Sequence, residues 1–201
     1  MTRWVTLGVT PRGDPLADGA TGEYSPWAEE IPNQTAPHHA KVPMSSAPAP
    51  VITPAGLLKH WQSHRRLTRR VIEAYPADQM NTFEVGGMRP FGAQVLEMLS
   101  MPVPTMVGIT TGKWEISFDQ GPHPKAVLLA RWDAQTKEID ALWPKVRPEA
   151  WQETMDAFGY FQGPAIDILL YVIDNEVHHR GQGYVYLRAL GVQPPAFGVR
   201  D

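Results

Sequence analysis

The stretch that decides the fold is a polar cluster inside the most apolar run of the chain: Asp174-Asn175-Glu176-Val177-His178-His179-Arg180-Gly181-Gln182. The apolar run extends from Ile166 to Tyr186. Gly163-Pro164 precedes it, and proline suits the first turn of a helix because its missing N–H would have no partner there. Gly191 and Pro194-Pro195 follow the run, which is typical of a helix end. The pattern predicts a long last helix in the centre of its domain.

Polar side chains of this predicted helix fall into one narrow stripe, because successive residues are 100° apart around a helix. The stripe contains Asn175, His179, Gln182 and Tyr186. It continues a line of aliphatic residues, whereas His178 points elsewhere and lies beside Asp174. A buried stripe that changes from aliphatic to polar side chains indicates a polar network or a site.

Length and composition exclude several classes of protein. The chain has 201 residues, which suits one domain and an appendage, and a net charge of -3, which favours neither nucleic acid nor an anionic membrane surface as a partner. It has no cysteine, so disulfides, thiolate ligands and a cysteine nucleophile are excluded. No apolar run reaches the roughly 18 to 20 residues of a membrane-spanning helix, and no signal peptide is recognisable. We therefore expect a soluble, cytoplasmic protein.

Residues 1–50 differ from the rest of the chain. They hold many of its prolines, few aliphatic residues and little periodicity. Such a segment buries too little apolar surface to order itself. We predict a poorly ordered, proline-rich leader over residues 1–50 and a single domain over residues 51–201.

Three further helices are predicted upstream of the last one. The first starts near Pro54, the second opens at Pro90 and breaks or kinks at Pro102, and the third runs from about Lys125 to Trp143. Apolar residues of the first helix keep the spacing of a bundle seam. Four helices joined by loops of this length predict an all-α fold, an antiparallel four-helix bundle.

Two polar residues stand out on these upstream helices. His64 lies on the seam of the first helix, where it is either a hydrogen-bonded core histidine or a site residue. Glu97 is the one charged residue in Val95-Leu96-Glu97-Met98-Leu99 on the second helix. It either faces solvent or, if it faces inward, is a candidate ligand or base.

The last helix resembles that of the DinB/YfiT-like superfamily, which comprises DNA-damage-inducible, metal-dependent four-helix bundles. The residues that carry the resemblance are Asn175 to Gln182, Tyr186-Leu187-Arg188, Gly191 and Pro194-Pro195. The resemblance extends to Met88-Arg89-Pro90-Phe91 and Leu57-Leu58, and it covers roughly residues 54–197. It also implies a homodimer.

The resemblance implies a metal ion held by three histidines, one from the second helix and two, four residues apart, from the last. In this sequence the three positions fall on Glu97, Asn175 and His179, so one histidine remains. Glutamate is an acceptable ligand for zinc, nickel or manganese, whereas a neutral asparagine oxygen is a poor ligand for zinc. A Glu/Asn/His set favours harder ions.

Three hypotheses about function follow. The first is a metal-dependent thiol S-transferase or hydrolase with a stress or detoxification role, acting on a small-molecule substrate with a low-molecular-weight thiol as partner. His64 or His178 would then be the base. The alternative is a non-catalytic small-molecule or stress-response binding bundle that has lost the three-histidine centre. In the third, Glu97, Asn175 and His179 form a buried network that fixes helix register.

Overall fold

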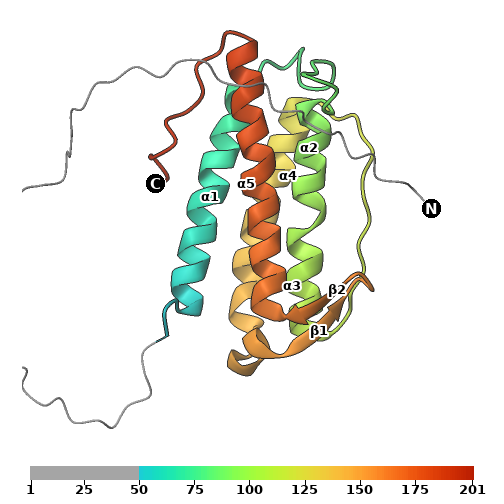
Figure 1. Ribbon diagram of the computed structural model, residues 1–201, viewed down its shortest axis with the longest axis vertical. Coiled ribbons are helices and arrows are strands. Elements are labelled where there is room, and N and C mark those ends of the chain that lie inside the picture. Colours follow the sequence, from blue (N-terminus) through green and yellow to red (C-terminus); the bar gives the residue numbers. More distant parts are fainter. Residues whose placement is uncertain (1–49) are drawn as a thin grey trace, which may run out of the picture. The chain divides into compact units, whose positions relative to one another are not determined.

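The computed structural model describes residues 50–201, so the predicted leader lies outside the described residues apart from Pro50. The described part contains five α-helices, two short 3₁₀ helices and a two-stranded sheet (Figure 1). The prediction of a mostly helical fold is confirmed, and the sheet was not predicted. None of the helices in this part of the chain is both long and apolar enough to cross a membrane.

Helix α1, Pro54–Ala74, begins where the sequence predicts. The Thr53 hydroxyl caps it by accepting a hydrogen bond of 3.0 Å from the Gly56 N–H. It ends because Tyr75 precedes a proline and is therefore extended. The predicted seam is buried: Leu57, Trp61, His64, Thr68, Val71 and Tyr75.

Helices α2, Phe91–Ser100, and α3, Pro102–Thr111, follow each other with only Met101 between them. Pro102 has no N–H with which α2 could continue, so the predicted break is present. The chain starts again at Pro102 as a separate helix, α3. Gly112 ends α3 in the left-handed conformation, at φ 74°. A Cβ on Gly108 would lie 2.2 Å from the Trp114 ring, so glycine is required where Trp114 anchors the following loop.

Helix α4, Lys125–Leu142, leads through the 3₁₀ helices Trp143–Lys145 and Pro148–Gln152 into a hairpin. Strands β1, Thr154–Ala157, and β2, Phe161–Pro164, pair antiparallel. The turn between the two strands places Phe158 at φ 58° and Gly159 at φ 71°, the positive values that a tight hairpin turn needs. Phenylalanine is an unusual residue at a positive φ, so the sequence carries no clear signal of this turn.

Helix α5, Ala165–Ala189, is the central element of the described domain and contacts α1, α2, α3 and both strands. In Figure 1 it runs lengthwise in front of α4, with α1 on one side and α2 and α3 on the other. Gly191 ends it at φ 74°, and the Val192 N–H bonds back to the Leu187 carbonyl at 2.8 Å. The predicted long, central last helix is confirmed.

The apolar core consists of two clusters, one toward each end of the helices. On α1, Leu57 and Trp61 belong to one cluster, and Val71 and Ile72 to the other. Buried polar and charged residues occupy the helical turns in between: His64, Arg65 and Thr68 on α1, and Glu176, His179 and Arg180 on α5. The candidate sites lie in this polar layer and beside it.

Candidate functional site

Glu97 on α2 meets Asn175 and His179 on α5. One carboxylate oxygen, Oε1, accepts a hydrogen bond from Asn175 Nδ2 at 3.1 Å and one from His179 Nε2 at 2.9 Å. The other, Oε2, forms an ion pair with Arg89. The structure therefore brings the three predicted ligand residues together, and it adds Arg89. We call these four residues the Glu97 site.

Arg89 is held in place through its backbone. It lies in the segment before α2, and its carbonyl oxygen accepts hydrogen bonds from the Tyr186 hydroxyl at 2.8 Å and from Gln94 Nε2 at 2.9 Å. Both donors are buried residues, one on α5 and one on α2. Because α5 itself fixes this carbonyl, the arginine side chain starts close to Glu97, although it is 57% exposed.

A chain of hydrogen-bonding groups leads from Glu97 to the surface. His179 Nδ1 faces Gln182 Oε1 at 3.3 Å, and Gln182 Nε2 donates to His178 Nε2 at 2.9 Å. His178 is exposed, so it lies at the outer end of this chain and not at the Glu97 carboxylate. The stripe of Asn175, His179 and Gln182 predicted from the sequence is thus a connected polar series along α5.

The Glu97 carboxylate is held in its ionised form. Burial by itself raises the pKa of Glu97, but hydrogen bonds from Arg89, His179 and Asn175 outweigh burial and lower the pKa to about 2. The negative charge is compensated by the guanidinium of Arg89, which lies against one oxygen. Protein groups alone therefore balance the negative charge of Glu97 and provide hydrogen-bond donors to both of its oxygens.

The residues present do not fit the divalent metal that the resemblance implies. Both oxygens of Glu97 are engaged by protein donors, and Asn175 turns its NH₂ group toward the carboxylate, which can only accept. A metal ion here would have to displace these three donors and lie near the positive charge of Arg89. Among residues 50–201, no group of three or more histidines and carboxylates is arranged to hold a metal.

His64 lies apart from the Glu97 site, in the contact between α1 and α5. Its Nδ1 accepts a hydrogen bond of 3.0 Å from Arg180, and its Nε2 faces His60 Nε2 at 3.1 Å. Burial lowers the pKa of His64 to about 4, and the charges of Arg180, His60 and Arg200 act in the same direction. The structure therefore does not bring this predicted base to Glu97.

A second polar cluster, centred on Glu176, was missed by the sequence analysis. Glu176 accepts hydrogen bonds from the Thr68 hydroxyl at 2.6 Å and from Trp61 Nε1 at 3.3 Å. Arg65, whose guanidinium stacks on Trp132, lies 3.8 Å from the same carboxylate. The signal in the sequence was present, because Arg65 follows Trp61 by four residues and Glu176 precedes Arg180 by four, which puts each pair on one helix face.

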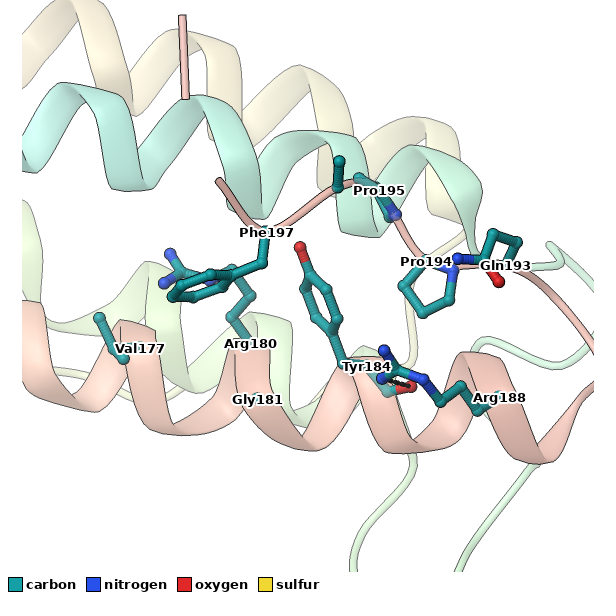
Figure 2. Close-up of a pocket in the computed structure, with 10 residues that line it drawn as sticks. Val177, Arg180, Gly181, Tyr184, Arg188, Gln193, Pro194, Pro195 and Phe197 are labelled. Atoms are coloured by element: carbon teal, nitrogen blue, oxygen red, sulfur yellow. Dashed lines mark hydrogen bonds between the residues drawn. The ribbon is translucent and has the colours of Figure 1, made fainter. Parts of the chain in front are cut away.

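A cavity of about 490 Å³ lies between α5 and the segment that follows it (Figure 2). Its wall on α5 contains Val177, Arg180, Gly181, Tyr184 and Arg188, and its wall on the following segment runs from Gln193 to Phe197. Figure 2 shows Tyr184 rising from α5 toward that segment, with Arg180 and Arg188 on either side. We call this the α5 cavity; it was not predicted from the sequence.

Comparison with known proteins agrees with this arrangement of elements. The sequence model of the DinB family matches residues 123–201, which contain α4, the hairpin and α5. A DinB-like protein from Bacillus cereus superposes with a TM-score of 0.58 at 21% identity, over 71% of this chain and 95% of that one. The DinB-like protein YjoA from Bacillus subtilis superposes with a TM-score of 0.57 at 18% identity, over 72% of this chain and 99% of that one. No curated protein sequence matches the chain.

Residues 123–201 are thus similar to the DinB family, and the described residues share the fold of two solved DinB-like proteins. The matched residues include Asn175, His179 and the lining of the α5 cavity.

Proposed function

We propose that this chain is a non-catalytic, small-molecule-binding member of the DinB-like superfamily that has lost the three-histidine metal centre. In this proposal α2 and α3 together serve as one member of an antiparallel four-helix bundle. The observation that carries the proposal is the state of Glu97, whose two oxygens are occupied by Arg89, Asn175 and His179.

Charge supports this reading of the Glu97 site. A divalent cation is bound by ligands whose negative charge or lone pairs are free to face it. Here one carboxylate charge is already balanced by one guanidinium charge, and the remaining ligand candidates, Asn175 and His179, carry no negative charge. Adding a cation would leave an excess of positive charge in a half-buried place, which is unfavourable at low dielectric.

The binding part of the proposal rests on the α5 cavity. Its volume of about 490 Å³ lies within the range of roughly 300 to 1,000 Å³ that is usual for small-molecule sites. Its lining combines apolar side chains, an aromatic ring and a few polar groups, the composition that such sites share. It is formed by α5, the same helix that supplies Asn175 and His179.

The second candidate is the metal-dependent thiol S-transferase or hydrolase. The observation in its favour is that Glu97, Asn175 and His179 do converge, on the positions that the resemblance assigns to metal ligands. It requires Arg89 to leave the carboxylate. His64, engaged by Arg180, would not be its base, and His178 lies at the surface end of the Gln182 chain.

Turnover and ligand binding by the same preparation distinguish the two candidates. Protein without a histidine tag is mixed with an electrophilic aromatic halide, low-molecular-weight thiols and each of zinc, nickel and manganese, and is separately screened for thermal shifts with small molecules. We expect thermal stabilisation by a small molecule and no metal-dependent thiol transfer or hydrolysis. Metal-dependent turnover that is abolished by Glu97→Gln would replace our proposal with the second candidate.

A further inference from the structure

We propose that the α5 cavity binds a small organic acid, with the acidic group beside Tyr184 and Arg188 and the apolar body against Phe197 and the neighbouring prolines. This inference rests on the proposed function, since it names the ligand class and the place where it binds.

Tyr184 provides the first argument. It lies in the cavity wall, and its hydroxyl is withdrawn from solvent with no hydrogen-bond partner among residues 50–201. A buried hydroxyl without a partner costs free energy, which an acceptor atom of a ligand recovers. The cavity therefore contains a donor that the protein itself leaves unused.

Positive charge provides the second argument. Burial raises the pKa of Tyr184, and the nearby charges of Arg180, Arg70, Arg188 and Arg200 oppose that rise. Within the described residues none of these four arginines forms an ion pair with a carboxylate. The one buried carboxylate near them, Glu176, is shared with Arg65. The electrostatic field around Tyr184 therefore favours an anion.

The arginines differ in how many hydrogen bonds they make to other protein groups. Arg180 donates to the His64 carbonyl, to Thr68 and to the His64 ring, and Arg70 donates to carbonyl oxygens of Val199 and Asp201. Among residues 50–201, Arg188 makes a single hydrogen bond of 3.3 Å, to the Tyr184 carbonyl, and its guanidinium lies 5.7 Å from the Tyr184 ring. Of the two arginines that line the cavity, Arg188 is therefore the one with donors available for a carboxylate.

Apart from Gln193, the rest of the lining is apolar and fits the body of such an acid. Val177, Pro194, Pro195, Ala196 and Phe197 supply most of it. In Figure 2 the Phe197 ring lies over α5 near Arg180, and the two prolines lie on the far side of Tyr184. A ligand with an aromatic or short aliphatic body and one carboxylate would satisfy both parts of the cavity.

The test compares acids with their neutral amides on the full-length protein. Phenylacetate, benzoate and octanoate are titrated against phenylacetamide, benzamide and octanamide, by calorimetry and by NMR shifts. We expect at least one acid to bind saturably, with its amide weaker by about tenfold, because charge-assisted hydrogen bonds are stronger than neutral ones. Equal binding of acid and amide, or no saturable binding by any of the acids, would overturn the inference.

Matched variants locate the binding. Tyr184→Phe removes only the hydroxyl, and Arg188→Gln only the charge; we expect each to weaken the acid by about fivefold or more. Arg147→Gln is the control, because Arg147 pairs with Glu153 and does not line the cavity. Unchanged affinity in both cavity variants would contradict the assignment.

Failure of the acid-binding site and failure of the proposed function give different experimental results. Metal-dependent turnover at Glu97 would overturn the proposed function whether or not acids bind. Conversely, binding of neutral molecules only, without turnover, would leave the proposed function standing and overturn the acid site.

Discussion

At the scale of single residues, the ionisation of a buried carboxylate depends on the donors and charges that face it. Glu97 is half-buried and meets three donors from two segments, so it stays ionised and needs no metal to balance it. Glu176 is fully enclosed and meets Thr68, Trp61 and Arg65. The two glutamates differ in their neighbours in the fold: Glu97 faces donors from α5 and from the segment before α2, whereas Glu176 faces side chains of α1.

His64 gives a prediction about pH. Its pKa of about 4 in the folded protein lies below the ordinary histidine value of 6.5, so the unfolded chain binds a proton first as pH falls. The free energy of unfolding should therefore decrease between about pH 6.5 and pH 4, by about 2 kcal/mol after allowing for solvent screening. Denaturant unfolding at a series of pH values measures this slope.

The matched variant for this pH effect is His64→Gln, since glutamine can accept from Arg180 and donate to His60 without titrating. It should lose most of the slope, whereas His178→Gln, at an exposed position, should keep it. A slope that is the same in His64→Gln and in the unchanged protein would show that other groups cause it.

Glu176 gives a prediction about stability. Glu176→Gln leaves the buried guanidinium of Arg65 without its carboxylate, which should destabilise the fold by about 3 kcal/mol. The exposed control Glu149→Gln should stay within about 0.5 kcal/mol. Because apolar replacements of both partners are often tolerated, Arg65→Met/Glu176→Leu should recover part of the loss. Equal losses in Glu176→Gln and Glu149→Gln would contradict this account.

At the scale of elements, α5 serves two sites because of the helical repeat. Asn175 and His179 lie on one line of the helix and face α2, while Glu176 and Arg180 lie about 100° further round and face α1. Neighbouring residues in the sequence therefore belong to different sites. Helix α5 also forms one wall of the α5 cavity through Tyr184 and Arg188.

The arrangement of α2 and α5 predicts that a metal centre can be rebuilt. Glu97→His/Asn175→His restores, with His179, the three histidines that the family resemblance implies. We expect this double variant to bind one zinc or nickel ion per chain, in calorimetric titration, where the unchanged protein binds none. A folded double variant without metal affinity would show that the helices do not present these positions correctly.

Element boundaries were largely predictable from the sequence, because prolines and glycines mark them. Pro76 ends α1, Pro102 separates α2 from α3, and Gly191 ends α5. The hairpin was not predictable in the same way, since its turn uses Phe158 at a positive φ. Its strands have only four residues each, too few for a clear alternation of apolar and polar side chains.

The candidate site was predictable only in part. Glu97, Asn175 and His179 were selected through the family resemblance, and the structure brings them together. Arg89 was missed because its role depends on the path of the chain before α2 and on the Tyr186 hydroxyl, which lies 97 residues further along. Such a contact between distant segments leaves no periodic signal in the sequence.

At the scale of the whole described domain, buried polar groups separate two apolar clusters. The helices are joined across this layer by the Glu97 and Glu176 contacts, which tie α5 to α2 and to α1. These contacts fix the rotation of α5 about its own axis, because rotating the helix would separate both Glu97 and Glu176 from their hydrogen-bond partners. The predicted leader, residues 1–50, stays a prediction, as does a homodimer.

The central claim is that protein groups alone satisfy Glu97, and metal content tests it most directly. Full-length protein without a histidine tag is purified from cells grown with added zinc, nickel and manganese, and its bound metals are measured by elemental mass spectrometry. Our account predicts far less than one ion per chain, and the same low content in Glu97→Gln and His179→Gln. Close to one ion per chain, lost in both variants, would contradict it.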